Sequence, residues 1–150
     1  MAELFERHWP LMHRAALLIT GDAAAAEDIA QEAFLSAIRA LDRFDMRRPL
    51  GPWLHRIATN RAIDWSRARA LRREVSDAGE VEPAASVVEG MDEELLAALQ
   101  TLGVEQRAVV VLRYVLDLTP GEIAQRLELP RGTVNSRLRR GLDALGERLR

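Results

Sequence analysis

The 150-residue sequence contains no cysteine and no lysine, and only 5% of its residues are aromatic. Without cysteine the chain can form neither a disulfide bond nor a thiolate metal site, which is consistent with a reducing compartment. No apolar run approaches the roughly 18 residues that a membrane-spanning helix needs. The first ten residues carry acids and lack the basic start and long apolar core of a signal peptide. We therefore expect a cytoplasmic protein without membrane insertion.

Histidine is also scarce, and its distribution does not suggest catalysis. His8, His13 and His55 lack the spacing of metal ligands. No set of a nucleophile and its base is visible, and no glycine-rich phosphate loop occurs. The sequence therefore predicts a protein that is not an enzyme, with no metal site and no cofactor.

The net charge of −2 is unevenly distributed, and all 21 basic residues are arginines. Residues 39–73 contain ten arginines and three aspartates, whereas residues 71–100 contain two arginines and eight acids. Residues 101–150 are basic again, with nine arginines and six acids. A nucleic-acid-binding surface needs only a local excess of positive charge, so the overall charge does not exclude one. The sequence predicts two basic zones separated by an acidic linker.

Apolar residues recur at helical spacing along almost the whole chain, and the alternation typical of strands is absent. This pattern predicts an all-α fold of two small helical domains, residues 1–72 and 91–150, joined by a flexible acidic linker over residues 73–90. Domains of this size lie near the lower limit for independent folding, so we expect each to be only moderately stable alone. The first five expected helices cover about residues 5–19, 23–41, 52–69, 91–102 and 106–116.

Two apolar stripes define the expected core of the first domain. Pro10 lies inside the first helix and predicts a kink or a break into two short helices. Asp22 is a suitable N-cap for the second helix. The stripes are Phe5, Trp9, Met12, Ala16 and Ile19, followed by Ile29, Ala30, Ala33, Phe34, Ala37, Ile38 and Leu41.

Residues 118–140 have the pattern of a helix-turn-helix. Thr119 can cap a helix that has Pro120 at its first position, and Glu122 completes a capping box. The segment Glu128-Leu129-Pro130 then ends this helix. A second helix begins near Pro130 to Thr133 and carries the apolar stripe Val134, Leu138, Leu142 and Leu145. With the two helices before it, this pair completes an expected four-helix C-terminal domain.

The second helix of this pair is basic on its polar side. Between residues 131 and 140 it has four arginines and no acid, together with serine, threonine and asparagine. These side chains reach phosphates and base edges in a major groove. An ordinary helical hairpin with a solvated basic face is the alternative at this point.

The helix expected over residues 23–41 has an unusual polar face. Leu35 lies there among Asp28, Gln31 and Glu32. An apolar residue in such surroundings is a candidate anchor for a protein partner. Single exposed leucines are also common, so both interpretations stay open on this evidence.

The order of these parts resembles the extracytoplasmic-function (ECF) group of bacterial RNA polymerase sigma factors. Residues 21–44 resemble region 2.2 of that family, and residues 52–69 resemble regions 2.3 to 2.4. Residues 103–127 resemble region 4.1 with the first helix of the helix-turn-helix, and residues 129–145 resemble the recognition helix of region 4.2. The resemblance covers nearly the whole chain except the linker.

The resemblance implies a role for each of these surfaces. It implies that the chain directs transcription initiation by binding core RNA polymerase, at the β′ clamp coiled coil and the β flap, and by recognising promoter DNA. An anti-sigma factor is a further implied partner. The residues implied to bind polymerase are Asp28, Gln31, Glu32 and Leu35. Those implied to contact the −35 duplex are Arg131, Thr133, Val134, Ser136, Arg137, Arg139 and Arg140. Those implied to contact the melted −10 strand are Phe44, Arg47, Arg48, Arg56, Asn60, Arg61 and Asp64.

Two alternatives differ in class from a sigma factor. A stand-alone helix-turn-helix regulator would account for residues 92–149, but it leaves the acidic face and the first basic zone without a purpose. Such a regulator would bind specific duplex DNA without polymerase. A helical adaptor with no role at DNA is the other alternative.

Overall fold

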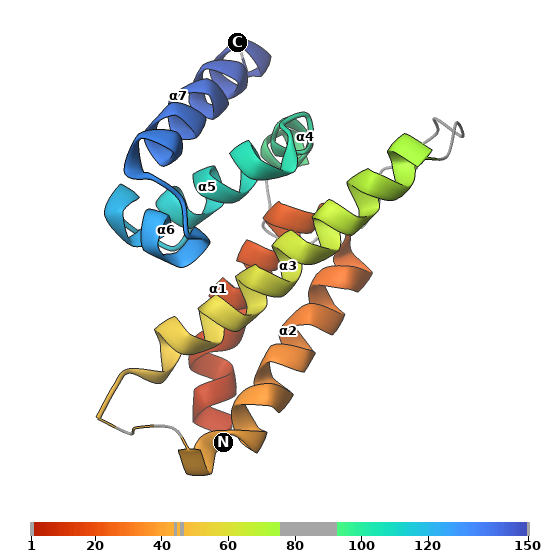
Figure 1. The fold of residues 1–150 in the computed structure, drawn as a ribbon. Helices are drawn as coiled ribbons and strands as arrows, with labels where there is room; N and C mark the ends of the chain where they lie inside the picture. The colour runs from red at the N-terminus through yellow and green to blue at the C-terminus, as the bar shows by residue number, and fades with distance from the viewer. Residues whose placement is uncertain (1, 44, 46, 76–92, 150) are drawn as a thin grey trace.

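All regular secondary structure in the described part of the chain is helical. The computed structural model describes residues 2–43, 45, 47–75 and 93–149, and no strand occurs among them, which confirms the all-α prediction (Figure 1). The elements are α1 (Ala2–Thr20), α2 (Ala23–Arg39), the short 3-10 helix η1 (Leu41–Arg43), α3 (Leu50–Val75), α4 (Glu93–Gln100), α5 (Val104–Tyr114), α6 (Pro120–Leu127) and α7 (Arg131–Arg148).

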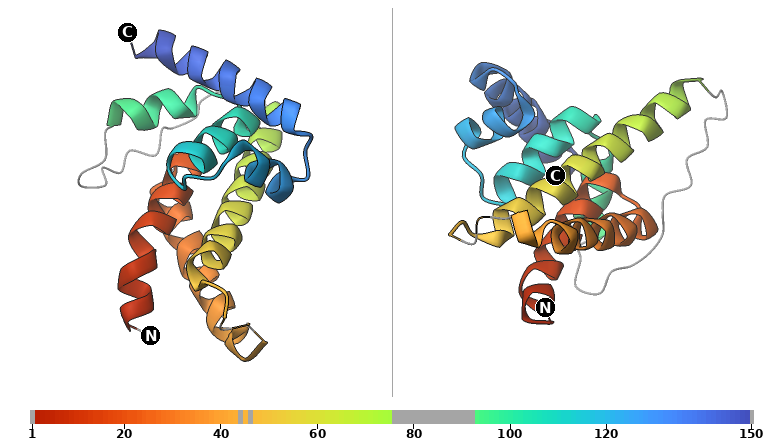
Figure 2. Two further views of the ribbon diagram at one scale, coloured as in Figure 1. Left: turned by 90° about the vertical axis from the view of Figure 1, so that its left-hand side faces the viewer. Right: turned by 60° about the horizontal axis from the view of Figure 1, so that its bottom comes forward.

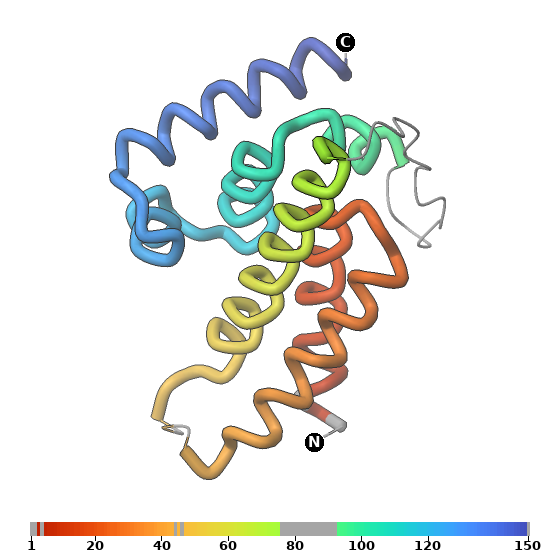
Figure 3. Tube along the Cα trace, turned by 45° about the vertical axis from the view of Figure 1, so that its right-hand side comes forward, coloured from red at the N-terminus to blue at the C-terminus, as the bar shows by residue number. Residues whose placement is uncertain are grey.

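Helices α1, α2 and α3 pack against one another, and together they are called the first lobe below (Figure 3). Asp22 caps α2 as predicted, because its Oδ1 accepts a hydrogen bond of 3.0 Å from the backbone N–H of Ala25. The buried stripe of α2 is mostly alanine, at Ala26, Ala30, Ala33 and Ala37. Small side chains on this stripe let α2 approach its neighbours closely.

Three sequence predictions for the first lobe need correction. Helix α1 is continuous through Pro10, so of the two expected outcomes the break into two short helices does not occur. Phe5 is exposed, but its ring stacks on that of Trp9 with the centroids 4.8 Å apart. Ile38 is 45% exposed because it follows buried Ala37 and is rotated about 100° from it around the helix.

The end of α3 also differs from the prediction. The helix extends to Val75, six residues beyond the expected end, so it continues into the start of the predicted linker, over residues 73–75. The remainder of the predicted linker lies outside the described residues.

Helices α4 to α7 form the second lobe, with the four helices that were predicted. The capping box of α6 is confirmed, since Glu122 N–H donates to Thr119 Oγ1 over 3.1 Å and Thr119 N–H donates to Glu122 Oε1 over 3.0 Å. Glu128 ends α6 in the left-handed conformation, with a φ of 56°. Helix α7 then begins at Arg131.

The predicted stripe of α7 is correct at three positions and wrong at one. Val134, Leu138 and Leu145 are buried, but Leu142 is exposed. The crossing point with α5 is the preceding residue, Gly141, where an added Cβ would lie 2.9 Å from Val110 Cγ2. The two helices approach so closely that only glycine fits there.

The two lobes lie against each other (Figure 2). Helix α5 packs against both α1 and α3, and α4 packs against α1. The buried apolar side chains of both lobes belong to one continuous cluster. The predicted division of the chain into separately folding domains stays a prediction.

Polar contacts between the lobes converge on the C-terminal carbonyls of α1. Gln100 Nε2 donates to the carbonyl of Leu18 over 2.9 Å, and Arg107 Nε donates to the carbonyl of Ile19 over 2.6 Å. These side chains satisfy carbonyl groups that have no partner inside their own helix. The second lobe therefore caps the first helix of the first lobe.

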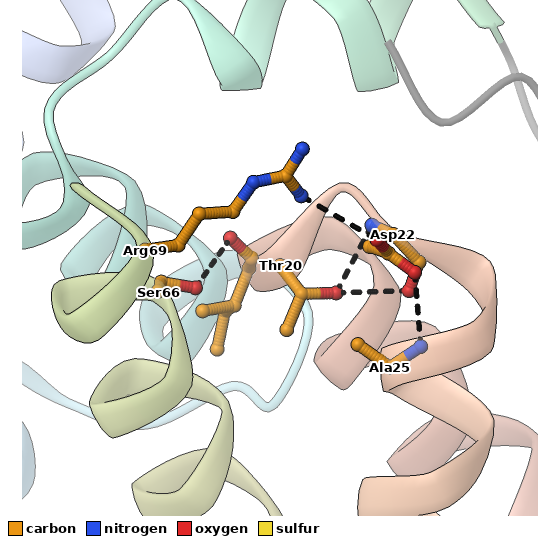
Figure 4. A network of polar contacts seen from close by, with 6 residues as sticks. Thr20, Asp22, Ala25, Ser66 and Arg69 are labelled. Carbon is orange, nitrogen blue, oxygen red and sulfur yellow. Dashed lines mark hydrogen bonds and ion pairs between the residues drawn. The ribbon is translucent and has the colours of Figure 1, made fainter. Parts of the chain in front are cut away.

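The same helix end is also tied to α2 and α3 (Figure 4). Ser66 Oγ donates to the carbonyl of Ile19 over 3.3 Å, and Arg69 Nη1 lies 3.4 Å from Asp22 Oδ2. Thr20 exchanges hydrogen bonds of 3.2 Å with the backbone of Asp22. Because three helices and the second lobe meet there, this turn fixes the arrangement of the whole molecule.

Candidate nucleic-acid interface

Helix α7 presents one polar flank opposite its buried stripe. At 100° per residue, Thr133, Ser136 and Arg140 lie on that flank, and Arg137 lies at its edge. Arg139 and Arg140 are exposed, whereas Thr133, Ser136 and Arg137 are half-buried. The flank therefore offers hydroxyl and guanidinium donors together, the groups that contact phosphates and base edges.

Two other residues proposed for this contact occupy different positions. Val134 is 0% exposed and belongs to the core of the second lobe, so its side chain cannot reach DNA. Arg131 is exposed at the start of α7, and its guanidinium lies over Gly121 of α6, where an added Cβ would be 3.1 Å from Arg131 Nη2. Arg131 is therefore directed towards the N-terminal end of α6, away from the flank.

Helix α3 carries a second polar stripe. Arg56, Asn60 and Asp64 are exposed at a spacing of four residues, and Arg67 continues the same line at the next turn. The stripe combines guanidinium donors with a side-chain amide. Guanidinium and amide donors of this kind are the groups that contact the backbone and bases of single-stranded nucleic acid.

The loop between α2 and α3 contributes further arginines. Arg48 is exposed, and Arg47 pairs with Asp45 at 3.2 Å between Nε and Oδ1. Phe44, which sequence reasoning proposed for base capture, lies outside the described residues.

The predicted partner-binding face of α2 is exposed. Asp28, Gln31, Glu32 and Leu35 follow one another at helical spacing on one side of the helix, and Leu35 is 43% exposed. Arg61 links this face to α3, because its Nη1 lies 3.7 Å from Glu32 Oε2 and its Nη2 donates to Ser36 Oγ over 3.1 Å. A residue proposed for DNA and a residue proposed for polymerase are therefore in contact.

Sequence reasoning missed an ion-pair cluster between the lobes. Glu105, in the first turn of α5, accepts two hydrogen bonds from Arg67, with Nε to Oε1 at 2.8 Å and Nη2 to Oε2 at 2.9 Å. Its Oε2 also lies 3.5 Å from Arg137 Nη1. The hydrogen bond from Arg67 and the charges of both arginines hold the pKa of Glu105 below its usual range. Arg67 and Glu105 are 38 residues apart in sequence, so no local pattern could reveal the pair.

Buried cationic groups are a second feature that the sequence did not reveal. Arg107 is buried, and it donates to the carbonyls of Ile19 and Leu102 over 2.6 and 3.0 Å. Burial, followed by the nearby charges of Arg73 and Arg69, lowers its pKa to about 10. The side chain stays charged at neutral pH and acts as a cap on carbonyl groups.

His55 of α3 and Arg126 of α6 are two further titratable side chains that are largely buried where the lobes meet. Burial, then the charges of His8 and Arg126, lower the pKa of His55 from 6.5 to about 4. Within the described residues, His55 Nε2 and Arg126 Nη1 are buried without a hydrogen-bond partner. Protonation of His55 is therefore unfavourable in this arrangement.

The described residues contain no group of three or more histidine, cysteine, aspartate or glutamate side chains that could hold a metal ion. None of the helices in that part of the chain is long and apolar enough to span a membrane.

Two family models match the chain in the order of its lobes. The model described as Sigma-70 region 2 matches residues 4–72, and the model described as Sigma-70, region 4 matches residues 92–145. An all-helical protein with a helix-turn-helix lobe and these two regions is of the class of transcription initiation factors.

Relatives of known name narrow this class. The chain is 36% identical to the ECF RNA polymerase sigma factor SigW of Bacillus subtilis, over 87% of this chain and 78% of that protein. It is also 36% identical to the ECF RNA polymerase sigma factor SigL of Mycobacterium tuberculosis, over 97% of this chain and 86% of that protein. The chain belongs to the ECF group of RNA polymerase sigma factors. It directs promoter-specific transcription and, like other sigma factors, is not an enzyme.

Solved structures share the fold. The sigma factor RpoE of Bartonella quintana, in complex with the anti-sigma factor NepR, has a TM-score of 0.79 and 24% identity over 99% of this chain and 95% of that chain. CnrH, in complex with the cytosolic domain of CnrY, has a TM-score of 0.68 and 28% identity over 99% of this chain and 86% of that chain.

Proposed function

We propose that the three exposed faces have separate tasks in promoter recognition. The α7 flank reads −35 duplex, the α3 stripe and the loop before it hold melted −10 strand, and the α2 face binds core RNA polymerase. The main support is that each face belongs to the matched region expected to perform that task. The order of the three faces along the chain is also the order of the corresponding regions in the family.

The −35 contact uses Arg131, Thr133, Ser136, Arg137, Arg139 and Arg140. Arginines supply affinity and register through phosphate contacts, and a bidentate arginine contact to guanine supplies sequence discrimination. Burial of Val134, Leu138 and Leu145 fixes the rotation of α7 about its axis and so determines which side chains face the groove.

The −10 contact uses Arg47, Arg48, Arg56, Asn60, Arg61, Asp64 and Phe44. Opening of duplex DNA costs stacking energy, on average about 1.4 kcal/mol per step. Capture of an unstacked base by an amide and by charged side chains offsets part of this cost. The aspartate has no attraction for phosphate, so its suitable role is hydrogen bonding to a base or orientation of Arg67, which lies 3.8 Å from it.

Core polymerase binds through Asp28, Gln31, Glu32 and Leu35, and further contact with the β flap is made by the second lobe. Leu35 is the apolar anchor, and the acids around it select a basic surface on the partner. Neither small lobe binds DNA tightly alone, so polymerase supplies the bivalency that lets both lobes engage one promoter. The protein acts in the cytoplasm, where polymerase is. An anti-sigma factor is a further proposed partner, since the sigma factor RpoE, which shares the fold, is bound to the anti-sigma factor NepR.

Reconstitution with core RNA polymerase tests the proposal. The purified chain is added to core enzyme and genomic DNA of its own organism, and transcription starts are mapped against a reaction with core enzyme alone. We expect a small set of new starts that share elements near −35 and −10. Starts identical to those of core enzyme alone would contradict the proposal, and specific duplex binding without polymerase would favour a stand-alone regulator.

A further inference from the structure

Glu105 connects the two surfaces to which DNA binding is assigned. Its carboxylate holds Arg67 at the end of the α3 stripe and Arg137 at the edge of the α7 flank. Arg67 and Glu105 belong to different lobes, whereas Glu105 and Arg137 are both in the second lobe. One carboxylate therefore joins the lobes and neutralises part of the recognition helix.

The geometry of this contact is that of an arginine bound to an anion. Two parallel N–H···O bonds from one guanidinium to a carboxylate form the same fork that binds a phosphate group. The donors of Arg67 that Glu105 occupies, and the charge of Arg137 beside it, are the groups that a DNA phosphate would use. Glu105 thus competes with the backbone of DNA.

The contact is weak enough to be reversed. The side chain of Glu105 is 40% exposed and that of Arg67 is 50% exposed, so water and salt screen their attraction. Other groups at the interface oppose closure, because Arg69 and Arg73 lie near the buried Arg107 and their like charges repel. Loss of the charge at Glu105 can therefore shift the equilibrium between a closed and an open arrangement of the two lobes.

We propose that Glu105 is an autoinhibitory element, which holds the lobes together through Arg67 and shields Arg137 until DNA phosphates displace it. The DNA part of this inference rests on the proposed function, but the closure of the lobes does not. In the free protein the closed arrangement predominates, and loss of the Glu105 charge shifts it towards an open one.

The first test measures the distance between the lobes in the full-length chain. Because the sequence has no cysteine, two cysteines can be introduced as unique sites for spin labels. They are Ala24→Cys on α2 and Asp143→Cys on α7, both at exposed positions. Double electron–electron resonance is recorded for the labelled parent and for the same protein with Glu105→Gln, Arg67→Gln or Glu147→Gln. Glu147→Gln is the matched control, since it removes the same charge from the exposed end of α7.

We expect Glu105→Gln and Arg67→Gln to move the distance distribution to longer values and Glu147→Gln to leave it unchanged. Added salt should lengthen the distances in the parent and have little further effect in Glu105→Gln. Distributions in Glu105→Gln and Arg67→Gln that match the parent would overturn the proposal. Because DNA and polymerase are absent, this readout does not depend on the proposed function.

The second test measures DNA binding by the free protein. The probe is a fluorescein-labelled, non-specific 25-base-pair duplex at low salt, read by anisotropy. If the open form is the one that binds, Glu105→Gln should bind about two- to five-fold more tightly than the parent, which is the change in the closed-to-open ratio that loss of one exposed ion pair allows. If Glu105→Gln opens the lobes but binds the duplex no more tightly than Glu147→Gln does, autoinhibition is overturned. Failure of the parent in reconstituted transcription would instead contradict the proposed function.

Discussion

Arg137 is proposed to contact promoter DNA, and in the free protein it is paired with Glu105. It lies at the edge of the α7 flank, half-buried, with its guanidinium directed to Glu105 over 3.5 Å. The orientation keeps the side chain close to the helix surface, where a major groove would reach it once Glu105 is displaced. Its contribution to promoter binding is therefore measurable by truncation.

Arg137→Ala should weaken binding of the polymerase holoenzyme to its promoter by about 1–3 kcal/mol if the guanidinium contacts a base. The measurement is the dissociation constant of the holoenzyme for a promoter fragment from the start mapping, with Arg148→Ala at the end of α7 as the control. Unchanged transcription from the cognate promoter would show that Arg137 does not read DNA.

Gly21 is a second residue whose role follows from geometry alone. Its φ of 68° is strained for any residue with a side chain, and an added Cβ would lie 2.4 Å from Gln100 Cδ. The turn between α1 and α2 is thus shaped to admit a side chain from the other lobe. The hydrogen bond from Gln100 to the carbonyl of Leu18 depends on this space.

Gly21→Ala should lower the free energy of unfolding by about 2–3 kcal/mol, from backbone strain and displacement of Gln100. Gln100→Ala removes the obstructing side chain, so the double variant should lose less than the two single variants together. Gly146→Ala is the control, because no atom lies within 4 Å of its added Cβ and alanine favours a helix interior. Urea denaturation measures all four variants, and additive losses would contradict this account.

At the scale of single elements, the best predictions were those that depend on neighbours in sequence. The capping box of α6 and the Asp22 cap of α2 are local hydrogen bonds, so residue type and spacing were sufficient. The helical stripes were correct except at their margins. Leu142 was expected to be buried, but the crossing with α5 occurs at Gly141, and only the partner helix decides which of two adjacent residues faces inward.

Contacts between elements were beyond the reach of sequence patterns. Arg67 is one of several arginines on α3, and Glu105 is one acid among several in the second lobe. The pair forms because α5 packs across α3, which no periodicity encodes. The same reason explains why Arg107 could not be recognised as a buried cap for α1.

The exposed face of α2 leads to a prediction at this scale. Asp28→Arg should impair binding to core polymerase while leaving the fold intact, because the carboxylate is exposed and the buried alanine stripe lies on the opposite side. Asp28 is a cleaner test than Glu32, whose reversal would also repel Arg61. A pull-down with core enzyme, with Asp143→Arg on α7 as the control, measures the effect. Normal retention of core enzyme by Asp28→Arg would argue against this face.

The molecule as a whole is held by an interface that combines attraction and repulsion. Gln100 and Arg107 cap α1 and Glu105 pairs with Arg67, but His55 of α3 lies close to the charge of Arg126 of α6. The charged groups that act on His55 are His8 on α1 and Arg126 on α6, and Arg126 in turn lies near Arg56 on α3 and Glu122 on α6. Neither His8 nor Arg126 is an acid, so the charges that act directly on a protonated His55 do not compensate it.

Acid should therefore weaken the closed molecule before its carboxylates titrate. The pKa of His55 is about 4 in the fold and 6.5 in the unfolded chain, so stability is unaffected above pH 6.5 and falls as the pH is lowered towards 4. The pKa of Glu105 lies below its usual value, so its contribution is lost only at lower pH. With allowance for solvent screening, we expect a loss of about 1 kcal/mol between pH 7.5 and 5.5. Urea denaturation at both pH values measures it, and His55→Gln should reduce the loss. An equal loss in His55→Gln would place the acid sensitivity elsewhere, with His8 the next group to test.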